Sequence, residues 1–414
     1  MLILPPHSGP RRWDWLEERS EFSKRRAPKR PQKEDAAWFC SELVALELSN
    51  QTEVFVIGGG PAGLAAALAA RQRGFEVTVA DSLAPPIDKP CGEGLMPDGI
   101  AALQRLGVNI SARHGQRFRG IRFVNSGLSA EAVFPNGTAL GVRRTDLHRI
   151  MVEHAATAGV CFLWGAVVTG LDGDRVLVNN EAVRARWIIG ADGGSSRVRR
   201  WAGLDIHRRK EQRYAFRRHY QVAPWADFME LHWGPNCQLY VTPVGPAEVC
   251  VALISRDPAL RLEQALAAFP YVASQLASAK HRSVERGAIS VTRKLARVCA
   301  GNIALVGDAS GGVDAITGEG LCLAFHQADL LADCLIRRDL ARYQREHRAL
   351  ARRPALMASL MLLLEHRRLR DRVMRSFATK PQLFAHMLAT HVGAASPLQG
   401  AATGLALGWS LLTT

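Results

Sequence analysis

Residues 53–63 of the 414-residue sequence read Glu-Val-Phe-Val-Ile-Gly-Gly-Gly-Pro-Ala-Gly, and this stretch decides the fold. The apolar, β-branched run 53–57 predicts a strand, the Ala- and Leu-rich run 61–73 predicts a helix, and 76–80 predicts a second strand. A strand, a glycine-rich turn, a helix and a second strand within about 30 residues form a βαβ unit. The sequence therefore predicts an α/β fold.

The turn between the first strand and the helix contains the glycine pattern GxGxxG, and an acidic residue follows the second strand. In this context the pattern is a fingerprint of dinucleotide binding. The first glycine permits the tight turn, the second lets the backbone approach a pyrophosphate, and the third lets helix and strand pack closely. The helix N-terminus donates N–H groups to the phosphates, and the acidic residue accepts hydrogen bonds from ribose hydroxyls. We therefore predict dinucleotide contacts at Gly58, Gly60, Pro61, Ala62, Gly63 and Asp81.

Two further glycine-rich segments follow along the chain. Residues 190–199 read Gly-Ala-Asp-Gly-Gly-Ser-Ser-Arg-Val-Arg, and residues 307–320 read Gly-Asp-Ala-Ser-Gly-Gly-Val-Asp-Ala-Ile-Thr-Gly-Glu-Gly. Together with 58–63, they resemble the FAD-dependent monooxygenase superfamily (group A, aromatic-hydroxylase-like), which also includes the geranylgeranyl reductases. The resemblance extends over residues 53–342. It implies FAD as the cofactor and NADH or NADPH as the electron donor.

The resemblance also implies further cofactor contacts. In the family, the segment matching 190–199 contacts FAD and lies on the path of the nicotinamide donor, and the segment matching 307–320 places its Asp on the flavin ribose. Arg144 matches the flavin-contacting Arg of an Arg-x-x-Leu pattern, and Val168 lies where the family's backbone holds the adenine. The implied contacts are Gly92, Arg144, Val168, Asp192, Gly193, Asp308, Gly318, Gly320 and Leu321.

The residues of the third segment support this role on their own. The apolar run 302–306 predicts a buried strand, and Asp308 follows its carboxyl end, where ligands bind in parallel sheets. Residues 317–320 open an apolar helix, whose free N–H groups would stabilise negative charge on the N1–O2 edge of a reduced flavin.

The segment 89–97 reads Lys-Pro-Cys-Gly-Glu-Gly-Leu-Met-Pro and resembles the Lys-x-Cys-Gly-x-Gly loop of the geranylgeranyl reductase branch, which approaches the flavin ring. The glycines of the loop suit a close approach of the backbone. We predict Cys91 as the catalytic residue, which either gates the substrate pocket or gives a proton to the substrate. The alternative is an ordinary small buried thiol.

Two functions follow from these features. The reductase branch carries a motif Tyr-x-Trp-x-Phe-Pro, whereas residues 238–243 read Gln-Leu-Tyr-Val-Thr-Pro. This departure favours a monooxygenase that hydroxylates an apolar or aromatic secondary metabolite. The alternative, which the Cys91 loop supports, is a reductase of isoprenoid or conjugated C=C bonds. In both cases the partner is a small apolar or aromatic substrate, bound among the aromatic residues of 214–255.

The charge of the sequence is concentrated in two stretches. With 53 Lys+Arg and 38 Asp+Glu the formal net charge is +15, of which 197–218 carries +7 and 337–375 carries +8. Such an excess suits nucleic acid, membrane surfaces or anionic ligands. No nucleic-acid recognition motif accompanies it, so we expect no nucleic-acid partner. Within 197–218, Arg197, Arg199 and Arg200 are expected to attract the phosphates of the donor, whereas residues 208–210 are equally expected to form a solvated turn.

The cysteines and the C-terminus add three expectations. The eight cysteines have no metal-ligand spacing and the N-terminal apolar run is too short for a signal peptide, so we expect no metal site and a cytoplasmic location. After Lys380 the sequence has no charged residue, and glycines recur at 400, 404 and 408. This tail is shorter than a membrane-spanning helix and is expected to pack on the FAD domain or on a second subunit, or to make a peripheral membrane contact. The oligomeric state is left open.

The predicted architecture is a discontinuous, Rossmann-type FAD-binding domain with an inserted β-rich substrate domain and a helical C-terminus. Residues 1–50 are expected to be a poorly ordered extension with a short helix at 36–48. The FAD-binding domain is predicted from 51–205 and 299–352, the substrate domain from 206–298, and the C-terminal helical segment from 353–414. One long helix is predicted over 340–365.

Overall fold

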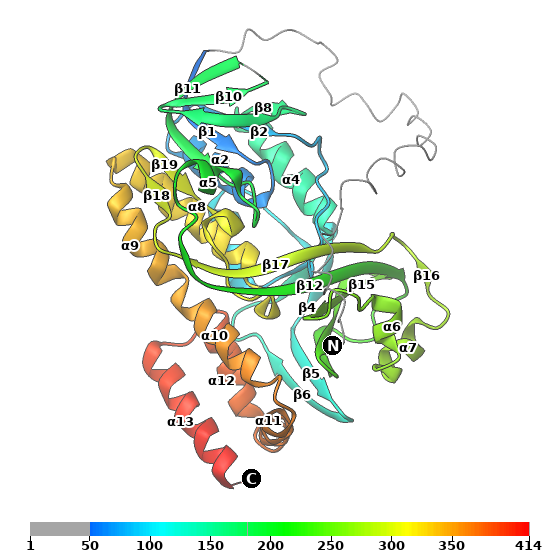
Figure 1. The fold of residues 1–414 in the computed structure, drawn as a ribbon. Coiled ribbons are helices and arrows are strands. Elements are labelled where there is room, and N and C mark those ends of the chain that lie inside the picture. Colours follow the sequence, from blue (N-terminus) through cyan, green and yellow to red (C-terminus); the bar gives the residue numbers. More distant parts are fainter. Residues whose placement is uncertain (1–49, 180, 414) are drawn as a thin grey trace, which may run out of the picture. The chain divides into compact units, whose positions relative to one another are not determined.

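The computed structural model describes residues 50–179 and 181–413, and the predicted N-terminal extension lies outside the described residues. Its first sheet is mostly parallel and contains the glycine fingerprint (Figure 1). In sheet order its main strands are β18 (Cys299–Ala300), β19 (Ile303–Leu305), β11 (Glu181–Gly190), β1 (Gln51–Ile57), β2 (Val77–Asp81) and β8 (Cys161–Trp164). A hairpin of β9 (Val168–Asp172) and β10 (Arg175–Val178) extends β11.

Helices cover this sheet, and the second half of its strand β1 is apolar. Residues 54–57 of β1 are all buried, as expected for a parallel strand with both faces covered. Helix α2 packs against both α4 and α8. These helices are α2 (Pro61–Gln72), α4 (Arg144–Thr157) and α8 (Gly320–Arg337), and α8 begins where the sequence predicts an apolar helix to open.

The second sheet is mostly antiparallel and draws strands from two distant parts of the chain. Its order is β16 (Lys280–His281), β12 (His207–Gln221), β15 (Glu248–Ser255), β14 (Cys237–Gly245), β13 (Phe228–Gly234), β5 (Gly120–Asn125) and β6 (Leu128–Val133), with β17 (Arg286–Leu295) on β12. Strand β5 runs parallel to β13, with Phe228 paired to Gly120. Two strands from the predicted first FAD segment thus complete the sheet of the predicted substrate domain. The domain boundaries themselves stay a prediction.

A small third sheet supports the loop that contains Cys91. It consists of β3 (Gly94–Leu95), β7 (Ala139–Gly141) and β4 (Gln116–Phe118), and α3 (Pro97–Arg105) follows β3 directly. The remaining short helices are η1 (Ala112–His114), α5 (Arg197–Trp201), α6 (Leu262–Leu266), α7 (Pro270–Leu276), η2 (Gly307–Ser310) and η3 (Ala315–Thr317).

The C-terminal part is helical, but the single helix predicted over 340–365 is wrong. The chain forms α9 (Leu340–Leu350) and α10 (Arg352–Leu363), which separate at Ala351. Pro354 has no N–H to donate to the carbonyl of residue 350, and its ring disfavours a continuous helix. The later helices are α11 (Arg367–Thr379), α12 (Pro381–His391) and α13 (Pro397–Thr413).

Helix α13 packs on α11 and α12, and its Leu407 and Leu411 join their hydrophobic core. Of the three spaced glycines, Gly400 faces Thr390 of α12, whereas side-chain positions at 404 and 408 meet open space. The opposite face exposes Leu398 and Leu405. Within the described residues, no helix is both long and apolar enough to cross a membrane. The peripheral membrane contact stays a prediction.

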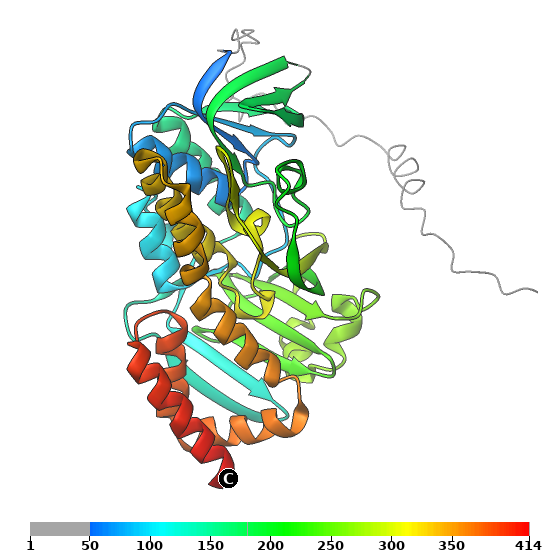
Figure 2. The same ribbon diagram turned by 60° about the vertical axis from the view of Figure 1, so that its left-hand side comes forward.

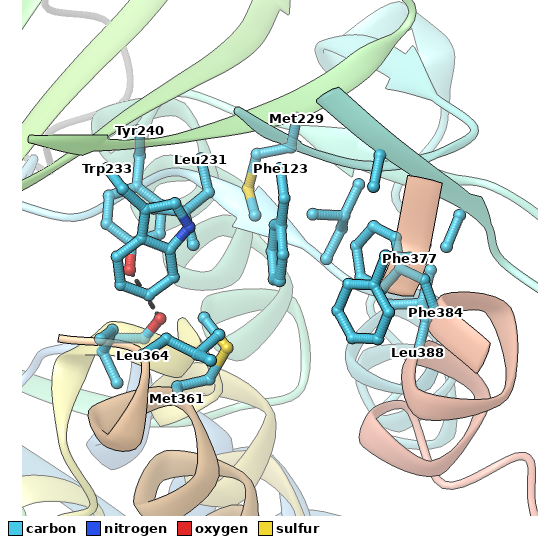
Figure 3. Close-up of a cluster of buried hydrophobic side chains, with 14 of the residues drawn as sticks. Phe123, Met229, Leu231, Trp233, Tyr240, Met361, Leu364, Phe377, Phe384 and Leu388 are labelled. Atoms are coloured by element: carbon cyan, nitrogen blue, oxygen red, sulfur yellow. Dashed lines mark hydrogen bonds between the residues drawn. The ribbon is translucent and has the colours of Figure 1, made fainter. Parts of the chain in front are cut away.

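The C-terminal helices lie beside the second sheet (Figure 2). A hydrophobic core is formed by side chains from this sheet and from these helices. Figure 3 shows side chains from the sheet meeting side chains from the helices. The rings of Phe123 and Phe384 lie 4.5 Å apart, and those of Phe377 and Phe384 stack at 4.9 Å. The C-terminal helices are therefore part of this core.

Candidate active site

The glycine loop after β1 has the geometry that its sequence predicts. Gly58 has φ +112°, and a Cβ on it would lie 2.5 Å from the Ala191 carbonyl oxygen. A Cβ on Gly63 would lie 1.8 Å from the Gly58 oxygen, so α2 can pack here only on glycine. By contrast, a Cβ on Gly60 would meet nothing within 4 Å. The N-terminus of α2 is open at Gly60, which leaves room for a pyrophosphate.

Asp81 lies beside this loop at the end of β2. Its Oδ2 accepts a hydrogen bond of 2.8 Å from the Gly59 N–H, and its Oδ1 accepts one of 2.8 Å from the Leu83 N–H. The carboxylate keeps further lone pairs for ribose hydroxyls.

His148 holds the same loop from the other side and was missed by the sequence analysis. The fully buried ring contacts the Gly59 carbonyl oxygen through Nε2 at 2.8 Å, and the Ile87 N–H donates to Nδ1 at 3.4 Å. Burial lowers the pKa of His148, so the ring is neutral and donates from Nε2. Its spacing of four residues from Arg144 on one helix was the available signal.

Arg144 is buried at the N-terminus of α4, and its backbone N–H donates to Glu93 Oε1 at 3.0 Å. Its Nε is buried without a hydrogen-bond partner among the described residues. Burial lowers the pKa of this guanidinium, since charge is costly where water is excluded. An acceptor such as a flavin carbonyl or a phosphate would satisfy this group.

Two further aspartates predicted to contact FAD, Asp308 and Asp192, have different partners in the structure. Asp308, in η2 after β19, points to the loop of 89–97 and pairs with Lys89 at 3.0 Å. Asp192 instead caps α5, because its Oδ2 accepts from the N–H groups of Arg197 and Val198 at 2.6 and 3.1 Å. The Oδ1 of Asp192 is buried with no partner in the described part of the chain.

The N-terminus of α8 is open toward the same region. Gly318 adopts φ +68°, and side chains at Gly318, Gly320 and Gly92 would meet nothing within 4 Å. Leu321 is half-buried behind Gly320, and Val168 is buried at the start of β9. The predicted contacts from 92, 308, 318 and 320 therefore leave space for a planar group.

The loop at Cys91 is held by the second sheet. The Thr242 hydroxyl of β14 donates to the Gly92 carbonyl at 2.8 Å, and the Cys250 thiol of β15 lies 3.8 Å from the Cys91 carbonyl oxygen. The Glu93 N–H lies 3.4 Å from the Cys91 sulfur, and Glu93 adopts φ +59°. Strands β14 and β15 thus position the loop over the candidate flavin site.

A buried polar network lies beneath this loop and was not predicted. His219 Nε2 contacts Glu93 Oε2 at 2.6 Å, Arg217 Nη1 contacts His219 Nδ1 at 3.1 Å, and Arg217 also pairs with Asp88. Arg217 and His219 alternate along β12 and therefore share one face of the sheet.

Much of the basic stretch 197–218 is inside the protein. Arg199, Arg213 and Arg217 are only 1–3 % exposed. Arg199 pairs with Asp205 at 2.7 Å, and Arg213 pairs with Asp314 at 2.7 Å. The expectation that Arg199 attracts the donor's phosphates is therefore wrong, and residues 208–210, expected as a turn, belong to strand β12. Arg197 and Arg200 remain exposed beside the 190–199 segment.

An apolar cleft opens inside the core shown in Figure 3. Its lining includes Ile316 and Thr317 of η3, which come directly before Gly318 in the chain. The Tyr240 hydroxyl, buried in its wall, donates to the Ile316 carbonyl at 2.7 Å. The cleft is lined by Ile121, Phe123, Met229, Leu231, Tyr240, Ile316, Thr317, Met357, Met361, Phe384, Met387, Leu388 and His391.

Two groups of potential metal ligands occur among the described residues. They are Glu93–His219–Cys250 and Asp98–Cys322–His326. An arginine already lies near each carboxylate, at 3.7 Å from Glu93 and 3.1 Å from Asp98. The expected absence of a metal stays a prediction.

Comparisons with known proteins give the same assignment as the three sequence segments. The FAD binding domain family matches residues 51–345. The chain is 29 % identical over 324 residues to a menaquinone reductase of Mycobacterium tuberculosis, covering 72 % of this chain and 79 % of the relative. It is 27 % identical over 295 residues to digeranylgeranylglycerophospholipid reductase 1 of Methanothermobacter thermautotrophicus, covering 66 % and 74 %.

A flavoprotein/dehydrogenase from Cytophaga hutchinsonii has the same fold, with a TM-score of 0.75 and 19 % identity over 88 % of this chain and 99 % of that one. The open positions at Gly60, Gly318 and Gly320 and the unsatisfied Nε of Arg144 fit FAD. The predicted superfamily and α/β fold are confirmed. The chain belongs to the FAD binding domain family, and it is an FAD-dependent oxidoreductase.

Proposed function

We propose that this protein is a flavin-dependent reductase that adds two hydrogens across a C=C bond of an isoprenoid or similar apolar chain. The observation that carries the proposal is the apolar cleft that is lined in part by η3. Only Tyr240, Thr317 and His391 bring polar side-chain atoms to its described lining, and the tyrosine hydroxyl is engaged with the Ile316 carbonyl. Such walls suit a flexible hydrocarbon chain better than a phenol or another polar ring.

Two of the relatives also support the reductase rather than the monooxygenase. They are named for the reduction of menaquinone and of digeranylgeranylglycerophospholipid. The loop of Cys91, Gly92 and Gly94, held by Thr242 and Cys250, carries the pattern that first suggested the reductase. Hydroxylation of an aromatic metabolite stays the second candidate, which the altered residues 238–243 favour.

When bound, FAD supplies the redox chemistry of the reaction. The residues proposed to hold it are those around the open glycine positions, with Asp81 and Asp308 on hydroxyl groups and Arg144 on a flavin carbonyl or phosphate. We propose NADH or NADPH as the donor, with the exposed Arg197 and Arg200 near its phosphates. Cys91 is proposed to cover the ring as part of its loop.

The test uses the FAD-loaded protein, reduced under anaerobic conditions and mixed with menaquinone. The expected product has gained two hydrogens and keeps them in air, which shows that a C=C bond was saturated. A product that returns to menaquinone in air shows that only the quinone ring was reduced, which contradicts the proposal. A product that gains an oxygen atom, and only when O2 is present, supports the monooxygenase instead.

A further inference from the structure

Glu319 is a buried carboxyl group at the N-terminus of α8, between the two open glycines 318 and 320. The residue is 4 % exposed. Its Oε2 lies 3.4 Å from Nδ1 of His391 on α12, and its Oε1 lies 3.5 Å from Nη2 of Arg353 on α10. None of the cofactor roles considered above uses this group.

Glu319 and His391 border two different spaces in the protein. His391 and Thr317 line the apolar cleft. Glu319 and Arg353 line a second cavity of about 240 Å³, in which Cys322 and His326 add polar atoms and Leu323, Ala349, Leu350 and Pro354 form the apolar wall. A cavity of this size with several polar groups is large enough to hold water. The carboxyl group of Glu319 and the imidazole of His391 therefore lie between the cavity that can hold water and the apolar cleft.

The pKa values of Glu319 and His391 suit proton transfer from the carboxyl group to the imidazole. Burial raises the pKa of Glu319 to about 8, with Arg353 opposing and Asp98 adding to the effect. Burial lowers the pKa of His391 to about 4. Asp98 and a hydrogen bond with the Thr317 backbone oppose this effect, and Arg353 adds to it. Near neutral pH the carboxyl holds its proton and the facing imidazole is neutral. Oε2 has no hydrogen-bond partner among the described residues, so a turn of the carboxyl group can direct its proton to Nδ1.

We infer that Glu319 and His391 deliver the proton for the reduction of a substrate in the apolar cleft. This inference rests on the proposed function, because saturation of a C=C bond takes up one hydride equivalent and one proton. When bound, the flavin supplies the hydride equivalent. A side chain or water has to supply the proton.

The transfer balances over two bonds. The Nε2–H bond of His391 breaks as the proton joins the substrate carbon, while the Oε2–H bond of Glu319 breaks and a new bond forms at Nδ1. The ring ends as its other neutral tautomer, and Glu319 ends as a carboxylate beside Arg353. Water in the second cavity, bordered also by His326 and Cys322, returns a proton to Glu319.

Cys91, the proton donor considered from the sequence, is a competing source. It does not belong to the described lining of the cleft, and its sulfur faces the backbone of Glu93. The two sources predict different sensitive variants: Glu319→Gln in one case and Cys91→Ser in the other.

The first measurement follows the Glu319 carboxyl itself by infrared spectroscopy of the full-length, FAD-loaded protein without substrate. Between about pH 6 and about pH 9.5, the carbonyl stretch of a protonated carboxyl is expected to disappear with a midpoint near 8. The band should be missing in Glu319→Gln, whose neutral amide replaces the acid with little change of shape. The control variant Glu346→Gln, on the exposed face of α9, should keep it.

The second measurement is a single turnover of the chemically reduced protein with an isoprenoid substrate. Glu319→Gln and His391→Gln should slow product formation about 10²- to 10⁴-fold, the usual contribution of a general acid. FAD binding should remain normal, which shows that the variants fold. The control variant Glu346→Gln should stay close to the parent rate.

The outcomes separate the two proposals. If no reduced product forms, the proposed function is wrong, and the delivery role is wrong with it. If product forms but Glu319→Gln keeps the parent rate, or the carboxyl titrates near its ordinary pKa, only the delivery role is overturned. If Cys91→Ser loses the rate and Glu319→Gln keeps it, the delivery role of Glu319 and His391 is also overturned, and the Cys91 thiol is the proton donor instead.

Discussion

The ammonium group of Lys89 lies 3.0 Å from Oδ2 of Asp308, a residue 219 positions later in the chain. This ion pair joins the Cys91 loop to the segment that follows β19. The two side chains are 47 % and 56 % exposed, so the pair contributes less than about 1 kcal/mol to stability. Its position at the predicted flavin site points instead to a role in cofactor binding.

Replacement of this lysine should separate binding from folding. In Lys89→Met we expect the free energy of unfolding to change by less than about 1 kcal/mol. The Kd for FAD should rise about 10-fold, because a cation near the anionic cofactor is lost. Flavin fluorescence titration measures the affinity, and Lys89→Arg should restore it. An unchanged Kd would show that the pair is irrelevant to the cofactor.

The glycine loop offers a matched pair of variants. Gly60→Ala adds a methyl group where nothing lies within 4 Å and φ is −70°, so stability should change by less than about 1 kcal/mol. FAD binding should nevertheless weaken about 100-fold, because the methyl group occupies the space left for the pyrophosphate.

Gly63→Ala should behave in the opposite way. Its Cβ would lie 1.8 Å from the Gly58 oxygen, so this variant should lose about 3 kcal/mol or more of folding stability. Urea unfolding and FAD titration of both variants provide the comparison. Equal stability losses in the two proteins would contradict the assigned geometry.

The buried Glu319 should make stability fall as pH rises. Its folded-state pKa of about 8 exceeds the ordinary value of 4.5, so the folded protein holds this proton more tightly than the unfolded chain. The associated stability is complete at low pH and is lost progressively up to about pH 8. His391 shifts in the opposite direction but only between about 4 and 6.5, which leaves a clear window above 6.5.

Between about pH 6.5 and 8 the parent should lose up to about 2 kcal/mol relative to Glu319→Gln. Urea denaturation at both pH values gives this difference directly. A parent whose stability relative to the variant stays constant over the window would show that Glu319 is already ionised in the folded protein.

The cleft should be closed by a bulky residue on α12. Leu388→Trp introduces an indole among Phe123, Phe384 and Met361, at a cost of about 1–3 kcal/mol in stability. Product formation should fall sharply, whereas chemical reduction and FAD content should remain normal. Leu388→Met conserves volume and should retain turnover, with a loss below about 1.5 kcal/mol. Full turnover of the tryptophan variant would place the substrate elsewhere.

The parts of this protein that follow from local pattern could be read from the sequence. The strand before Gly58, the open position at Gly60 and the start of α8 each depend on residues close together in the chain. The glycine at 63 was assigned to helix–strand packing, and its contact with the Gly58 oxygen confirms that role.

Features that depend on pairing between distant segments could not be read in this way. The parallel pairing of β5 with β13 gives no local signal, since both strands have ordinary apolar patterns. Arg213 and Arg217 resemble surface residues in the sequence, and only Asp314 and Asp88 explain their burial. The contact between Glu319 and His391 likewise joins two helices 72 positions apart.

The cleft has consequences for how such an enzyme can diversify. Its inner wall comes from strands that the family match includes, whereas Met357, Met361, Phe384, Leu388 and His391 come from helices beyond residue 345. Exchange of this terminal block could alter chain-length preference while the nucleotide-binding half is inherited unchanged. On the proposed function, replacement of one contiguous stretch of the gene would therefore change which substrate the cleft accepts.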